Sequence, residues 1–186
     1  MITAIVLASG YSSRMGKNKL LLSKDDIPMI EHLFRQLYKI NFHDVIVVTQ
    51  YREVERLAKS YGYTTVINDM PQNGISESIK LGVNNTYIYS NFMFFTGDQP
   101  FLTSEVIEKI MDISDNQYIV VPRFLGKNKS PVIFGNIYRG DLLKLTGDTG
   151  GKVIIKNNLD SIKYVNFSDG SDFLDIDTVE EYEKIR

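Results

Sequence analysis

A loop of small and basic residues near the amino terminus is the first candidate for chemistry. An apolar run at residues 5–7 leads into it, and Arg14, Lys17 and Lys19 close it. Small residues let backbone N–H groups approach a ligand, and successive N–H groups form a concavity that suits anions. Together with three positive charges, this pattern predicts a triphosphate-binding loop.

Two better-known phosphate loops do not fit this stretch. A P-loop has four residues between its first glycine and a Gly-Lys pair that Ser or Thr follows. Here five residues separate Gly10 from Gly16, and Asn18 follows Lys17. No G-x-G-x-x-G follows the strand, which excludes the dinucleotide fingerprint. The loop is therefore a phosphate loop of another kind, and an ordinary turn with solvated lysines is the alternative.

Asp98 is the second candidate, because it directly follows the most hydrophobic run of the chain, residues 92–95. A carboxylate beside phosphates requires a cation, and Mg²⁺ is commonly held by one or two carboxylates plus substrate phosphates. Gly97 leaves room for such an ion, and Pro100 stiffens the exit of the loop. The alternative is an aspartate in an ordinary strand-ending turn.

Three further stretches are weaker signals on their own. Asp175 and Asp177 alternate along an extended segment, which puts both carboxylates on one side of it, although they could also serve the dipole of the following helix. Residues 73–78 precede a short helix whose N-terminal N–H groups could hold a base or ribose, and capping by Ser76 explains them as well. Residues 147–152 form a glycine-rich turn that suits either an acceptor phosphate or a plain helix connection.

Alternating strands and helices must position these groups. Apolar runs predict strands at 5–7, 45–49, 64–67, 92–95, 118–121 and 162–165, with helices between most of them. A hairpin or lid is expected at about 123–135, and Thr178 with Glu181 predicts a capping box for the last helix. The fold class is therefore α/β, with a mostly parallel mixed sheet and helices on both faces. Ligands of such sheets bind at the carboxyl ends of the strands, where these motifs should meet.

Composition excludes several classes of protein. The chain has 186 residues, 43% hydrophobic and 24% charged, which fits a single soluble domain with a sizeable core. A net charge of −2 argues against general nucleic-acid binding, and the absence of cysteine excludes disulfides and thiolate sites. With neither a signal peptide nor an apolar run near membrane length, we expect a cytoplasmic protein without a membrane partner.

Taken together, the motifs resemble the molybdenum cofactor cytidylyltransferase family, whose MobA-like NTP transferase domain belongs to the nucleotidyltransferase superfamily. The matching stretches follow the family's order along nearly the whole chain: 7–16 with Lys19, 73–78, 97–100, 147–150 and 175–178. The resemblance implies one Rossmann-like three-layer α/β/α domain over 1–186 that uses Mg²⁺ and a nucleoside triphosphate.

The resemblance also implies a role for each matching residue. Catalytic roles fall to Arg14, Lys19 and Asp98, and metal binding to Asp98, then Asp177, then Asp175. Nucleotide binding falls to Leu7, Ala8, Ser9, Gly10, Ser12, Ser13, Arg14, Lys19, Asn73, Gly74, Ser76, Ser78 and Gly97. Acceptor binding falls to Pro131, Gly147, Asp148 and Gly150.

Two departures from the family pattern bear on the substrates. The cytidylyl branch usually reads Ala-Ala-Gly in the first loop and the guanylyl branch Ala-Gly-Gly, whereas this chain has Ala8-Ser9-Gly10. A side chain at position 9 takes room that glycine leaves for a purine, which favours CTP. The lid has Lys129-Ser130-Pro131 where the family commonly has Gly-His-Pro, so the pterin side departs from the family.

The expected reaction is transfer of CMP from CTP to the terminal phosphate of molybdopterin or molybdenum cofactor, with release of pyrophosphate. A molybdoenzyme or a cofactor chaperone is the protein partner that the resemblance implies. One alternative is a non-catalytic carrier of molybdenum cofactor, which the changed lid fits but which would not need Lys19 and Asp98. Others are use of GTP or transfer to another phosphorylated acceptor, such as a sugar phosphate.

Overall fold

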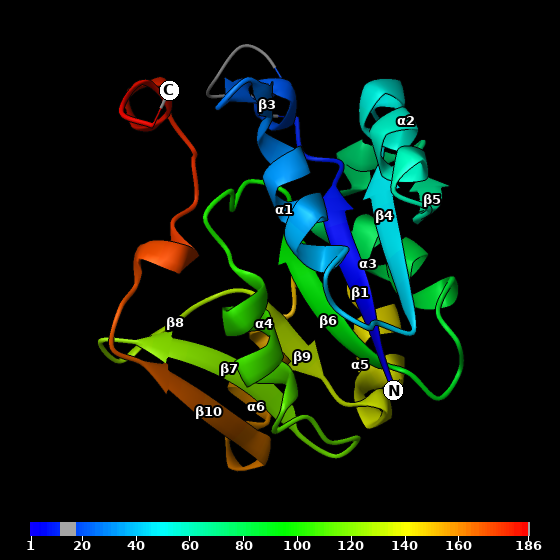
Figure 1. Ribbon diagram of the computed structural model, residues 1–186. Coiled ribbons are helices and arrows are strands. Elements are labelled where there is room, and N and C mark those ends of the chain that lie inside the picture. The colour runs from blue at the N-terminus through cyan, green and yellow to red at the C-terminus, as the bar shows by residue number, and fades with distance from the viewer. Residues whose placement is uncertain (12–17, 186) are drawn as a thin grey trace.

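The computed structural model describes residues 1–11 and 18–185, and its centre is an eight-stranded sheet with helices on both faces (Figure 1). The strand order is β10-β7-β9-β6-β1-β4-β5, and β8 pairs with β7 at one side. The strands are β1 Ile2–Ala8, β4 Asp44–Thr49, β5 Thr64–Ile67, β6 Asn91–Thr96, β7 Ile119–Phe124, β8 Lys127–Asn128, β9 Val132–Phe134 and β10 Ile162–Phe167. A separate hairpin pairs β2 Ser23–Lys24 with β3 Ile27–Pro28.

Strand β1 lies in the sheet between β4 and β6 and runs parallel to both. Its Leu7 is paired with Val48 on one side and Thr96 on the other. The carboxyl ends of the three strands are therefore level, and the loops that follow them emerge at the same edge of the sheet.

Alternation along the strands builds two cores. Ala4, Val6 and Ala8 face one side of β1, in a cluster with Phe34 and Phe95. Ile5 faces the other side and packs in a second cluster. The side chains at the centre of each cluster, such as Val6 and Ile5, are fully buried, as expected for a sheet whose strands are apolar on both faces.

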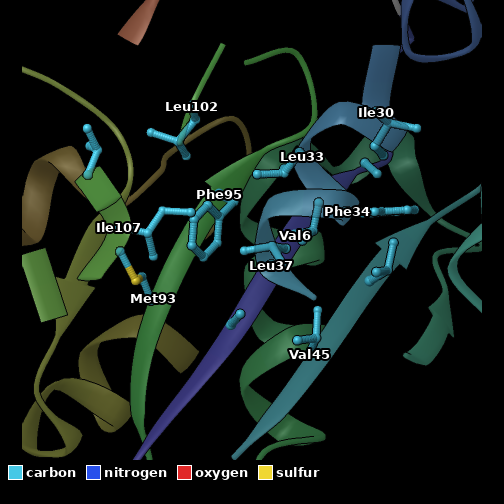
Figure 2. Packing of buried hydrophobic residues seen from close by; sticks show 14 of the residues in the cluster. Val6, Ile30, Leu33, Phe34, Leu37, Val45, Met93, Phe95, Leu102 and Ile107 are labelled. Atoms are coloured by element: carbon cyan, nitrogen blue, oxygen red, sulfur yellow. The ribbon is translucent and has the colours of Figure 1, made fainter. Parts of the chain in front are cut away.

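Helices α1, α2 and α4 cover the first face, and α3, α5 and α6 cover the second. Figure 2 shows the first core, where Leu33 and Leu37 of α1 lie over Val6 of β1, and Ile107 of α4 lies beside Phe95 and Met93 of β6. The helices are α1 Met29–Leu37, α2 Arg52–Ser60, α3 Ile75–Asn84, α4 Ser104–Met111, α5 Arg139–Leu143, α6 Lys152–Asn157 and α7 Val179–Glu183. In the described part of the chain, no helix is long and apolar enough to cross a membrane.

The observed architecture confirms the α/β class and the mostly parallel mixed sheet, and all six predicted strands are present. Thr178 and Glu181 form the predicted capping box of α7. Residues 123–135 include the predicted hairpin, and their predicted role as a lid stays a prediction. The turn at Leu125 and Gly126 does join β7 to β8, but β9 then enters the sheet antiparallel to β6 and β7. A three-residue strand is too short for its pattern to separate it from a surface hairpin.

Two helical glycines give a matched test of this packing. A Cβ at Gly82 in α3 would lie 2.5 Å from Cγ2 of the buried Ile5, whereas a Cβ at Gly140 in α5 would meet nothing within 4 Å. We expect Gly82→Ala to lower the free energy of unfolding by about 1–3 kcal/mol through overpacking. Gly140→Ala should raise it by about 0.5–1 kcal/mol through helix propensity. Urea denaturation measures both, and equal effects would contradict the close contact of α3 with β1.

Candidate functional site

A cavity of about 620 Å³ opens at the carboxyl ends of β1 and β6, the edge of the sheet that the sequence predicts. Its lining includes most of the predicted nucleotide site and the predicted acceptor residues Gly147 and Asp148. The lining residues are Leu7, Ala8, Ser9, Gly10, Tyr11, Lys19, Leu20, Pro71, Gln72, Asn73, Gly74, Ile75, Ser78, Thr96, Gly97, Asp98, Gly147 and Asp148. Ser12, Ser13 and Arg14 lie outside the described residues, so their predicted roles stay predictions.

Hydrogen bonds from the end of β4 fix the loop after β1. The hydroxyl of Thr49 donates to the carbonyl of Ala8 at 3.0 Å, and Nε2 of Gln50 donates to that of Ser9 at 2.7 Å. The hydroxyl of Tyr51 donates to the carbonyl of Gly10 at 2.7 Å. Three successive carbonyl oxygens are therefore bound by residues 49–51, which sequence reasoning did not include in the site. The sequence carries no signal for them, because their role depends on the pairing of β4 with β1.

The Lys19 ammonium joins the two acidic segments of the site. Its Nζ lies 2.6 Å from Oδ2 of Asp98 and 2.6 Å from Oδ1 of Asp177. The side chains of Lys19 and Asp98 are only 14% and 17% exposed, so water screens this pair weakly, whereas Asp177 is 49% exposed. Desolvation lowers the pKa of Lys19, but the two carboxylates outweigh it, and the pKa lies above its ordinary value. The site thus holds one cation between two anions.

The C-terminal segment brings Asp175 and Asp177 to this place. In Figure 1 it runs along one side of the molecule, and α7 lies beside the β2–β3 hairpin. The N–H of Ile176 donates to the carbonyl of Asp98 at 3.1 Å, and the hydroxyl of Tyr182 donates to the carbonyl of Ser23 at 2.6 Å. Ile176 is buried while its two acidic neighbours are exposed, as the predicted alternation requires.

Several polar atoms around the cavity are buried without a hydrogen-bond partner among the described residues: Asn18 Nδ2, Ser76 Oγ, Thr96 Oγ1, Asp98 Oδ1 and Gln99 Oε1. Buried polar groups are normally paired, so this concentration indicates a place prepared for a ligand. Oδ1 of Asp98 in particular is free to act as an oxygen ligand of a cation.

Within the described ranges, no three acidic or histidine side chains form a complete metal site. Mg²⁺ needs only one or two carboxylates when phosphates supply its other ligands, so the donor set fits that ion.

Part of the cavity wall is built from two glycine turns in close contact. Gly74 has φ of 82°, and a Cβ there would lie 2.5 Å from the backbone of Gly147. The N–H of Ser76 donates to the carbonyl of Gly147 at 3.2 Å, and the N–H of Ile75 donates to the carboxylate of Asp148 at 3.4 Å. Asp148 therefore caps the start of α3 as well as lining the cavity.

Among the described residues, three that were predicted to bind nucleotide or acceptor lie outside the cavity lining, in positions that the fold explains. Ser76 is fully buried in the first turn of α3, and Pro131 is buried just before β9. Gly150 packs towards Ile75, whose nearest methyl group would be 3.6 Å from a Cβ at that glycine. Their contacts with a substrate stay predictions.

Comparison with known proteins finds a family model that matches most of the chain. The model of the MobA-like NTP transferase domain matches residues 4–162. The chain belongs to the MobA-like NTP transferase family. A probable molybdenum cofactor guanylyltransferase of Bacillus anthracis is 28% identical over 96% of this chain and 92% of its own length. A protein of the same description from Pyrococcus horikoshii is also 28% identical, over 66% of this chain and 62% of its own.

Other relatives are matched over less of their length. A 3-deoxy-manno-octulosonate cytidylyltransferase of Francisella tularensis is 32% identical, but over only 56% of this chain and 43% of its own. The chain thus spans less than two thirds of several relatives that it matches.

Solved structures share the fold. A nucleotidyl transferase from Methanothermobacter superposes with a TM-score of 0.86 at 23% identity, over 100% of this chain and 96% of its own. A Mycobacterium tuberculosis protein solved in complex with manganese gives a TM-score of 0.78 at 21% identity, over 99% of this chain and 97% of its own.

The acidic cluster predicts a pH dependence of stability. Desolvation raises the pKa of Asp175 to about 6, and the charges of Asp98 and Asp177 add to the rise. The folded state therefore binds this proton more tightly than the unfolded chain, whose aspartates titrate near pH ~3.9. We expect Asp175→Asn to become progressively more stable than the wild type as pH rises from about 4 to above 6.

Denaturation at several pH values in EDTA measures this difference. The effect should be small, because Asp175 as a residue is exposed and water screens its charge. Asp160→Asn, at an exposed residue in the turn after α6, controls for the loss of one negative charge. If the stability difference between Asp175→Asn and the wild type does not change with pH, the raised pKa of Asp175 is contradicted.

Proposed function

We propose that this protein transfers a nucleoside monophosphate from a nucleoside triphosphate to the terminal phosphate of molybdopterin or molybdenum cofactor, and releases pyrophosphate. The observation that carries the proposal is the position of Lys19 and Asp98. They face each other at 2.6 Å in a cavity that the small-residue loop lines. A cation, a carboxylate and a phosphate loop in one cavity are the parts that phosphoryl-group chemistry needs.

In the proposed reaction, an oxygen of the acceptor phosphate forms a bond to the α-phosphorus of the nucleotide. The α–β phosphoanhydride bond breaks, and its electron pair leaves with pyrophosphate. Because the acceptor phosphate is already ionised, no general base is required, and catalysis is mostly positioning and charge stabilisation. A cation about 4 Å from a developing unit charge contributes roughly 4 kcal/mol at an effective dielectric of about 20, which is the part we assign to Lys19. Arg14 has the same proposed role.

Asp98 and Asp177 are the residues that would hold Mg²⁺, with Asp175 as a further candidate. When bound, the ion would neutralise the phosphates and orient them. The unpaired Oδ1 of Asp98 and the exposed carboxylate of Asp177 support this part of the proposal. The manganese complex of the related M. tuberculosis fold supports use of a divalent ion.

The acceptor is the least constrained part of the proposal. Molybdenum cofactor is supported by the family and by the descriptions of the two guanylyltransferase relatives. Gly147 and Asp148 line the cavity and are the acceptor contacts we propose first, with Gly150 and Pro131 as further candidates outside the lining. A molybdoenzyme or a cofactor chaperone would be the recipient of the product.

Neutral replacements at the two facing charges should nearly abolish turnover. We expect Lys19→Met and Asp98→Asn each to lower kcat by about 10²- to 10³-fold, the loss typical when one electrostatic contact to a transition state is removed. Pyrophosphate release with nucleotide, Mg²⁺ and molybdopterin measures it, and circular dichroism checks the fold. Lys156→Met and Asp141→Asn, at exposed residues outside the cavity, are the matched controls. Turnover like that of the wild type in either site variant would refute the role of that residue.

The nucleotide that we propose is CTP. Ser9 lines the cavity, and its hydroxyl donates to the carbonyl of Val48 at 3.2 Å, so its Cβ is held in a fixed position. Among the described residues, no atom lies within 4 Å of a Cβ added at the neighbouring Gly10. Two relatives are described as guanylyltransferases and one as a cytidylyltransferase, so the base must be tested directly.

Removal of the Ser9 side chain should favour a purine. We expect Ser9→Gly to raise the ratio of GTP to CTP in kcat/KM by about tenfold, the scale of a small steric change in a binding pocket. Ser9→Ala keeps the Cβ and loses only the hydroxyl, so its ratio should stay close to that of the wild type. Competition assays with both nucleotides measure the ratio. A wild-type protein that already prefers GTP would overturn the assignment to CTP.

A further inference from the structure

Asn68 lies behind the wall of the cavity and has three hydrogen bonds that fix it. It follows β5 and is 1% exposed. Its backbone N–H donates to the carbonyl of Thr49 at 2.8 Å. In its side chain, Oδ1 accepts from the N–H of Met70 at 3.0 Å, and Nδ2 donates to Oγ of Ser78 at 3.1 Å.

These contacts determine the direction of the hydrogen bond to Ser78. The N–H of Met70 can only donate, so the side-chain atom of Asn68 that faces it must be the oxygen. The NH₂ group then faces Ser78, and an amide NH₂ group can only donate. Oγ of Ser78 is therefore the acceptor in this bond, and its own hydrogen must point elsewhere.

Ser78 is 5% exposed and lines the cavity. Across residues 1–11 and 18–185, no group accepts the hydrogen of its hydroxyl. A nearly buried hydroxyl whose hydrogen has no acceptor among the described residues is suited to donate to a ligand in the cavity.

We propose that Asn68 fixes the hydroxyl of Ser78 as a hydrogen-bond donor to an acceptor oxygen of the bound nucleoside. Asn68 is then a positioning residue that does not itself contact the nucleotide. The inference rests on the proposed function, because it requires that a nucleotide occupies the cavity.

Asn68→Asp reverses the bond with almost no change of shape. One oxygen of the new carboxylate still accepts from Met70, and the second now accepts from Ser78, whose hydrogen is drawn away from the cavity. We expect the Kd for CTP with Mg²⁺ to rise about tenfold, the worth of one hydrogen bond, and Ser78→Ala to raise it by a similar factor.

The double variant separates this mechanism from simple charge repulsion. If the carboxylate at position 68 has drawn the hydrogen of Ser78 away from the cavity, Ser78→Ala should not weaken nucleotide binding much further in the Asn68→Asp background. If the new charge merely repels the triphosphate, Ser78→Ala should cost the same factor in both backgrounds, and the proposal would be overturned.

Asn91 offers a matched control at the other end of the sheet. Its Nδ2 donates to Oγ of Ser114 at 3.2 Å and its Oδ1 accepts from the N–H of Asn136 at 2.9 Å, so it repeats the arrangement of Asn68. It begins β6, whereas the cavity lies where that strand ends. Asn91→Asp should leave the Kd unchanged, and a tenfold rise there would overturn the proposal.

Calorimetric titration of the full chain tests all of these variants and identifies the acceptor oxygen. With 2′-deoxy-CTP, the effect of Ser78→Ala should persist if the base supplies the oxygen and disappear if the ribose 2′-hydroxyl does. Nucleotide binding by the wild type that neither Ser78→Ala nor Asn68→Asp weakens would overturn this inference alone. A wild-type protein that binds no nucleotide would overturn the proposed function with it.

Discussion

One ammonium group between two carboxylates joins the parts of the chain on which the site depends. Lys19 follows the first strand, Asp98 follows β6, and Asp177 belongs to the C-terminal segment, 79 and 158 residues away along the chain. A largely buried ion pair is favourable only where its geometry is good and its remaining lone pairs are satisfied. Oδ1 of Asp98 is not satisfied by the described residues, which is why we regard this arrangement as a site for a charged ligand.

The sheet supplies the precision that such a bridge needs. Because β1 is parallel to both neighbours, the loop after β1, the 49–51 triplet and the loop of Asp98 all start from level strand ends. Two fully buried cores hold these strands from both faces. The C-terminal segment is anchored to the first core by Phe173, and the buried Ile176 donates its N–H to the carbonyl of Asp98. Burial thus positions both halves of the site, and hydrogen bonds and charge then join them.

The sequence predicts those features whose cause is local. Apolar runs mark the central strands because these strands are buried on both faces, and Asp98 is found because it ends the most apolar run. Gln50, Tyr51 and Asn68 escaped notice because their roles depend on which strands are neighbours, and no spacing along the chain states this. Gly147 and Asp148 were placed near a substrate, but their contact with Gly74 and the start of α3 could only be seen in three dimensions.

Calorimetry of nucleotide binding with and without a divalent ion tests most directly whether this edge of the sheet is one combined site for metal and nucleotide. We predict a saturable heat when CTP is added with Mg²⁺, a much weaker one in EDTA, and loss of the difference in Asp98→Asn. If no heat of binding is measured under either condition, or if neither EDTA nor Asp98→Asn changes the binding, a combined site for metal and nucleotide is contradicted.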